Sequence, residues 1–174
     1  MAQAVFCIAR TEPQARTIVT ELKNAGFRPG DISVLFPDKT GSRDFAHEQH
    51  TKAPEGATTG AATGGMLGGV LGWLAGVGTL AIPGVGPFIA AGPIMAALSG
   101  AAAGAAFGGV AGALVGYGIP EYEAKRYEGK VREGNILISV HTEDHRARSD
   151  AREIFERCDA EDVGSAPEVH APTP

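Results

Sequence analysis

Residues 4–37 read A-V-F-C-I-A-R-T-E-P-Q-A-R-T-I-V-T-E-L-K-N-A-G-F-R-P-G-D-I-S-V-L-F-P. The stretch begins with a short apolar run of strand type at 4–8. Thr11 then supplies an N-cap for a helix with proline in its first turn, and Gly26 supplies the C-terminal stop. A second apolar run at 32–36 has strand length. The stretch therefore predicts β-α-β.

A related order of elements occupies the C-terminal part of the sequence. The run P-E-Y-E-A-K-R-Y-E-G predicts a short helix that ends at Gly129, and N-I-L-I-S-V at 135–140 predicts a strand. Asp144 or Ser149 begins an amphipathic helix, and A-E-D-V-G-S at 160–165 predicts a final edge strand.

The two flanks together predict an α+β fold. Their order, β-α-β and then β-α-β, is that of a ferredoxin-like domain with two helices on one sheet. Each flank alone is too small to bury a good core, so the domain is split by an insertion. The expected division is a first half with linker (1–56), an uncharged glycine-zipper helical hairpin (57–118), a second half (119–164) and a flexible tail (165–174).

The insertion is defined by its lack of charge. Residues 56–120 contain no Asp, Glu, Lys or Arg, and 18 of the 25 glycines lie between Thr58 and Gly118. All charged side chains belong to the flanks, and neither flank carries a basic stripe. Nucleic acid is therefore not an expected partner.

Two glycine-rich runs inside the insertion match each other. They read G-A-A-T-G-G-M-L-G-G-V-L-G-W-L-A-G and G-A-A-A-G-A-A-F-G-G-V-A-G-A-L-V-G. Glycine recurs every four residues in both. The predicted helix-packing and oligomerisation positions are Gly60, Gly64, Gly68, Gly72, Gly76, Gly100, Gly104, Gly108, Gly112 and Gly116.

Glycine at this spacing removes side chains along one ridge of a helix, so that another helix can approach closely. The expected helices are 58–80 and 94–117, about 34 and 36 Å long, which exceeds the ~30 Å hydrocarbon core. The connection at 81–93 contains three prolines, which interrupt helix. A hairpin of two crossings returns the chain to the side from which it started.

Three interpretations account for an uncharged stretch of this length. The first is a lipid membrane, the second is a soluble homo-oligomer that buries the hairpins between subunits, and the third is a disordered Gly/Ala tract. Basic residues before and after the insertion favour both termini on the cytoplasmic side. The N-terminal residues lack the pattern of a signal peptide, and Cys7 and Cys158 suit a reducing compartment as free thiols. The expected location is the cytoplasmic face of the membrane, or the cytoplasm for a soluble assembly.

No catalytic, cofactor-binding or metal-binding motif is recognised. The histidine pairs in H-E-Q-H (47–50) and H-T-E-D-H (141–145) lack H-E-x-x-H spacing and neighbouring cysteines. P-D-K-T-G-S (37–42) lacks the glycines of a phosphate loop. A non-enzymatic protein without cofactors is therefore expected.

Several stretches resemble the bacterial general-stress, or heat-induced stress, protein family. They are F-C-I-A-R-T-E-P-Q-A-R-T-I-V-T-E-L-K-N-A-G-F, D-I-S-V-L, A-I-P-G-V-G-P-F-I-A-A-G-P and G-I-P-E-Y-E-A-K-R-Y-E-G-K-V-R-E-G-N-I-L-I-S-V. The resemblance implies a small α/β domain with a glycine-zipper insertion after its second strand, and a stress-associated role without catalytic residues. Tyr122 and Tyr127 then lie either at a membrane boundary or over the domain core.

The expected function is a structural protein that associates with membrane and self-assembles through its glycine-zipper helices. A soluble shell, filament or particle is the alternative. A small-ligand sensor is a further alternative, based on analogy with other ferredoxin-like domains.

Overall fold

The computed structural model describes residues 3–37, 78–82, 86–91, 110–116 and 118–167. The chain is α+β. Its elements, in order, are β1 (Gln3–Ala9), α1 (Glu12–Asn24), the 3-10 turn η1 (Pro29–Asp31), β2 (Ile32–Pro37), β3 (Gly78–Ile82), β4 (Gly86–Ala91), α6 (Val110–Gly116), α7 (Glu121–Arg132), β5 (Ile136–Thr142), α8 (His145–Arg157) and β6 (Glu161–Pro167).

The described strands form one sheet of order β3-β4-β2-β5-β1-β6, in which all neighbours are antiparallel. The neighbouring strands β1 and β5, both inside the sheet, come from opposite ends of the sequence. Val140 on β5 pairs with Val5 on β1 and with Ile32 on β2, so the flanks share one core. β6 pairs with β1 at the edge of the sheet, as its sequence predicts, but it continues to Pro167, so the predicted tail is wrong at residues 165–167.

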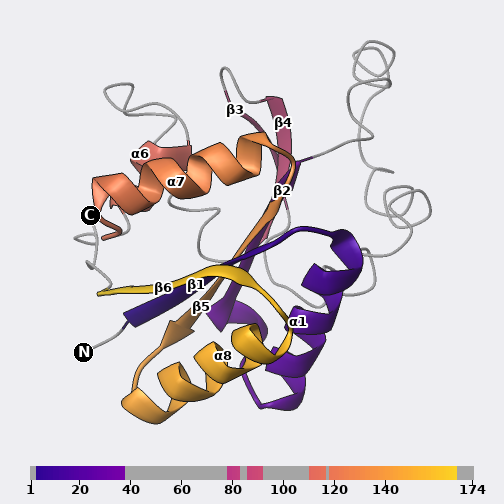
Figure 1. Ribbon diagram of the computed structural model, residues 1–174, viewed down its shortest axis with the longest axis vertical. Coiled ribbons are helices and arrows are strands. Elements are labelled where there is room, and N and C mark those ends of the chain that lie inside the picture. The colour runs from indigo at the N-terminus through magenta and orange to yellow at the C-terminus, as the bar shows by residue number, and fades with distance from the viewer. Residues whose placement is uncertain (1–2, 38–77, 83–85, 92–109, 117, 168–174) are drawn as a thin grey trace.

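Helices cover both faces of this sheet, with α1 and α8 together on one face and α6 and α7 on the other (Figure 1). Side chains alternate between the two cores along β1: Val5 and Cys7 face α1 and α8, whereas Phe6 and Ile8 face α7. Double coverage explains why Ala4 to Ala9 are all buried, and therefore why the run is apolar without alternation.

The helix ends follow from local sequence. Thr11 and Asp144 accept hydrogen bonds from Gln14 N and Ala147 N and so cap α1 and α8. α1, α6 and α7 all end in the same way. A glycine in the left-handed conformation follows the helix, and its amide and the amide of the next residue donate hydrogen bonds to carbonyl oxygens of the last helical turn. These glycines are Gly26, Gly118 and Gly134, with φ of 93°, 102° and 95°. Asp159, with φ of 55°, takes this place after α8.

The predicted first zipper helix, 58–80, is wrong at its end, because residues 78–80 belong to β3. The predicted connection also contains β4, which pairs with β2 in the register Val34↔Ala91. Thr79 and Ile89 are paired strand-favouring residues, and the open edge of β2 supplies their hairpin with backbone partners. The rest of this helix, at 58–77, lies outside the described residues.

The predicted second zipper helix, 94–117, agrees with the structure at 110–116, and 94–109 lies outside the described residues.

The predicted end of the next helix at Gly129 is wrong, because α7 continues to Arg132. Val131 beyond this glycine is fully buried, and its burial offsets the roughly 1 kcal/mol that glycine costs inside a helix. α6 and α7 form a second helical layer on the sheet. The predicted sandwich of two helices on one sheet does not include this layer.

Candidate functional site

Two of the ten predicted packing glycines, Gly112 and Gly116, lie on α6. The other eight lie outside the described residues. α6 turns Val110, Ala113 and Leu114 into the core against α7 and the sheet. Its opposite side is open: Gly116 is exposed and Val115 is 42% exposed.

No described atom beyond its own helical turn lies within 4 Å of the position that a Cβ would take at Gly116. Close helix contact, the usual reason for glycine in a helix, is therefore not made here within the described residues. Among the described residues, the Cβ position of Gly116 therefore faces open space.

α6 is held in place by a carboxylate from α7. Glu128 Oε2 accepts a 3.0 Å hydrogen bond from the amide of Ala111, in the first turn of α6, where amides lack intrahelical acceptors. Glu128 also pairs with Arg132 one turn later on α7. The exposed side of α6 therefore has a fixed direction relative to the sheet.

The two tyrosines of α7 have different surroundings. Tyr127 is 4% exposed, packs on Phe6 with ring centroids 6.0 Å apart, and donates a 2.8 Å hydrogen bond to the carbonyl oxygen of Asp162. Tyr122 is 78% exposed. Of the two predicted locations for these tyrosines, Tyr127 therefore lies over the domain core. Tyr122 lies on the surface, where a partner or an interface can reach it.

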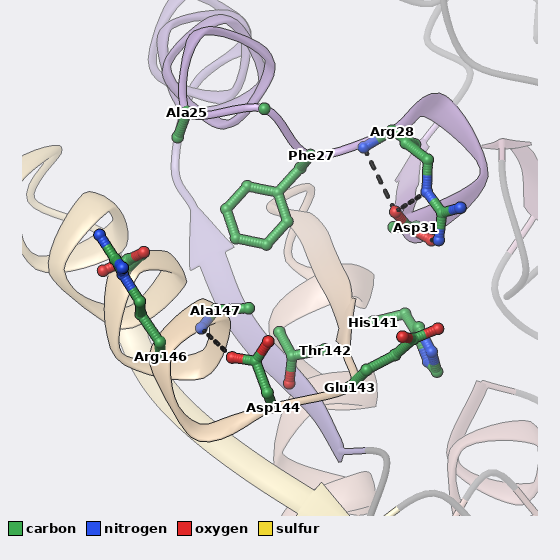
Figure 2. A pocket seen from close by; sticks show the side chains of 12 residues that line it. Ala25, Phe27, Arg28, Asp31, His141, Thr142, Glu143, Asp144, Arg146 and Ala147 are labelled. Carbon is green, nitrogen blue, oxygen red and sulfur yellow. Dashed lines mark hydrogen bonds and ion pairs between the residues drawn. The ribbon is translucent and has the colours of Figure 1, made fainter.

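A cavity of about 320 Å³ lies between the end of α1 and the start of α8. It is lined by Ala25, Gly26, Phe27, Arg28, Asp31, His141, Thr142, Glu143, Asp144, Arg146, Ala147 and Asp150. Figure 2 shows the Phe27 ring between the Arg28–Asp31 pair and Arg146, with Glu143 and Asp144 across the cavity from the ring.

Most polar groups of the cavity are already engaged. Arg28 Nε donates to Asp31 Oδ2 at 2.9 Å, and the charge and hydrogen bond of Asp31, with a smaller contribution from Glu143, raise the pKa of Arg28. Asp144 Oδ1 accepts from Ala147 N at 2.8 Å, and Thr142 Oγ1 donates to the carbonyl of Gln3 at 2.7 Å.

Sequence reasoning did not find this cavity. Gly26 and Asp144 were recognised only as a helix stop and a helix start, and His141 only as part of a histidine pair. The pairing of β2 with β5 brings the two segments together, and no local pattern indicates that pairing.

The two cysteines are free thiols on the α1–α8 side of the sheet. Cys7 is fully buried, and burial raises its pKa well above the ordinary thiol value. Burial also raises the pKa of Cys158. Within the described ranges, no three His, Cys, Asp or Glu side chains are grouped as a metal site would need.

Searches against protein-family models, curated proteins and solved structures return no match for this chain. The resemblance to the general-stress family stays a prediction. None of the helices that the structure describes combines the length and apolar character needed to span a membrane.

Proposed function

We propose that this chain is a non-enzymatic structural protein that self-assembles through its glycine-zipper helices at a membrane surface. The observation that carries the proposal is the outward direction of Gly116 on α6. Gly116 is the last residue of α6, and no described neighbour lies within 4 Å of its Cβ position, so this side of the helix carries no side chain there. A second helix can approach the backbone closely at such a position.

The flanks act as the platform for this assembly, and we infer that they form a ferredoxin-like unit. The strand order β2-β5-β1-β6, with α1 and α8 on the same face, supports this inference. α7 and α6 cover the other face, so the zipper segment reaches the platform through a packed helix. Movement at the zipper is therefore coupled to the sheet through α7.

The membrane as the partner rests on the uncharged stretch at 56–120, which supplies no solvated helix face. The exposed Tyr122 and Val115 adjoin the end of this stretch, and an amphipathic tyrosine ring suits the lipid–water boundary. A stress-associated role rests on the family resemblance alone.

The test of assembly uses the full chain in detergent, with Gly116→Leu as the variant and Val115→Leu as the matched control. Both changes add bulk to exposed positions of α6, but only the first fills the glycine ridge. We expect Gly116→Leu, and more strongly Gly68→Leu with Gly108→Leu, to reduce oligomer size on a sizing column. Unchanged oligomers in both glycine variants would refute the zipper.

A soluble shell, filament or particle is the second candidate, favoured by the same exposed ridge. Carbonate-resistant pelleting with membranes distinguishes the two, because a soluble assembly stays in the supernatant. The sensor alternative draws on the cavity beside Phe27, which is considered next.

A further inference from the structure

The cavity beside Phe27 has an excess of negative charge. Four carboxylates line it, on Asp31, Glu143, Asp144 and Asp150, against the two guanidinium groups of Arg28 and Arg146. Arg28 is paired with Asp31. Arg146 and Asp150 stand one turn apart on α8, so their charges offset each other. Asp144 caps α8 and Glu143 contributes to the raised pKa of Arg28, but the cavity still has two more carboxylates than guanidinium groups.

An anionic ligand is disfavoured in this cavity despite the N-terminus of α8. The Asp144 carboxylate already occupies that helix terminus through Ala147 N, and it repels a second anion. The Arg28 guanidinium is held by both oxygens of Asp31, and the Thr142 hydroxyl is used by Gln3. The donors that an anion needs are therefore largely engaged.

A cation meets better partners. The Phe27 ring lines the same cavity and offers an aromatic face, on which a positive group gains about 0.5–1 kcal/mol at an exposed site. Glu143 is exposed and lies across the cavity from that ring. The volume of about 320 Å³ is at the lower end of the range for small-molecule sites.

We propose that this cavity binds a small organic cation, an aliphatic amine, between the Phe27 ring and the Glu143 and Asp144 carboxylates. The site lies at the α1–α8 side of the sheet, whereas the zipper helix α6 lies on the other side (Figure 1). Amine binding is therefore independent of self-assembly, and either activity can fail without the other.

Equilibrium dialysis of the purified full chain against radiolabelled 1,5-diaminopentane tests the site, with glutarate as the five-carbon dianion control. We expect the diamine to be retained and glutarate to be excluded. Glu143→Gln should weaken diamine binding about 1.4- to fivefold, the range for one exposed ion pair. Phe27→Leu should weaken it about two- to fivefold.

Glu153→Gln is the matched control, because Glu153 is exposed on α8, outside the cavity, and its loss changes net charge equally. It should leave diamine binding unchanged. Equal losses in Glu143→Gln and Glu153→Gln would show binding to overall charge and overturn the site. Failure to retain the diamine, or equal retention of glutarate, would also overturn it.

Discussion

Tyr127 on α7 donates a hydrogen bond of 2.8 Å from its hydroxyl to the backbone carbonyl of Asp162 on β6. The same pair of elements is joined by the ion pair between Arg126 and Asp162 and by a 3.6 Å contact between Lys130 and Glu161. The helix that follows the uncharged stretch is thereby fastened to the edge strand of the sheet.

Tyr127→Phe should lower the free energy of unfolding by about 1–2 kcal/mol, because it removes the hydrogen bond and leaves a part-buried carbonyl unpaired. Urea denaturation followed by circular dichroism measures the change. Tyr122→Phe is the control, and at 78% exposure it should alter stability by less than about 0.5 kcal/mol. Equal effects of the two changes would contradict the assigned role.

Gly164→Ala should destabilise the fold by about 1–3 kcal/mol, because its Cβ would lie 2.7 Å from the Tyr127 hydroxyl oxygen. The other neighbours of this Cβ position, Glu123 Oε2 at 3.7 Å and Tyr127 Cζ at 4.0 Å, are at ordinary contact distance. Gly164→Ala should consequently cost much less in the Tyr127→Phe background. A double-mutant cycle measures this coupling, and purely additive losses would show that the hydroxyl is not the obstacle.

Asp159→Gly should stabilise the protein by roughly 1 kcal/mol, because Asp159 holds a left-handed conformation that glycine adopts without strain. Gln14 bonds the carbonyl oxygens of Cys158 and Asp159, and these backbone groups survive the substitution. Gly134→Ala is the opposite change at the end of α7 and should destabilise by a similar amount. Thermal unfolding compares the two, and a loss of stability in Asp159→Gly would be evidence against this explanation.

Alkaline pH should reduce stability through Cys7. Burial raises the pKa of its thiol in the folded state, so the unfolded chain ionises first once pH exceeds the ordinary value of 9.0. The neutral, buried thiol therefore contributes its full share to the free energy of unfolding below pH 9.0. Above that pH the free energy of unfolding falls by up to about 1.4 kcal/mol per pH unit. Urea denaturation between pH 7 and 10 measures the slope, and Cys7→Ala should make it shallower. An unchanged slope would exclude Cys7 as the cause.

Much of the fold is predictable because its signals are local. The caps at Thr11 and Asp144, the stop at Gly26 and the apolar strands β1 and β5 all appear where the sequence indicates. The sequence does not predict the β3–β4 hairpin, because residues 78–80 continue the pattern of the preceding helix and the prolines at 81–93 indicate a connection. The free edge of β2 supplies the backbone partners that make this segment a hairpin.

The candidate sites differ in how far sequence reveals them. Glycine spacing identifies a ridge on α6, but only the packing of Val110 and Leu114 shows that the ridge points away from the core. The amine cavity depends on two segments that approach only in the folded sheet. Neither Phe27 nor Glu143 belongs to a recognisable motif.

The pairing of β1 with β5 and β6 has a consequence for synthesis of the chain. Gln3 pairs with Thr142 and with Pro167, so β1 has no neighbour until β5 has been made and lacks its second neighbour until β6 has been made. By that time the ribosome has already produced the whole uncharged stretch, without a folded domain beside it. Such long-range pairing folds slowly and leaves apolar surface exposed. We therefore expect the nascent chain to depend on a chaperone or an early membrane contact more than the finished protein does.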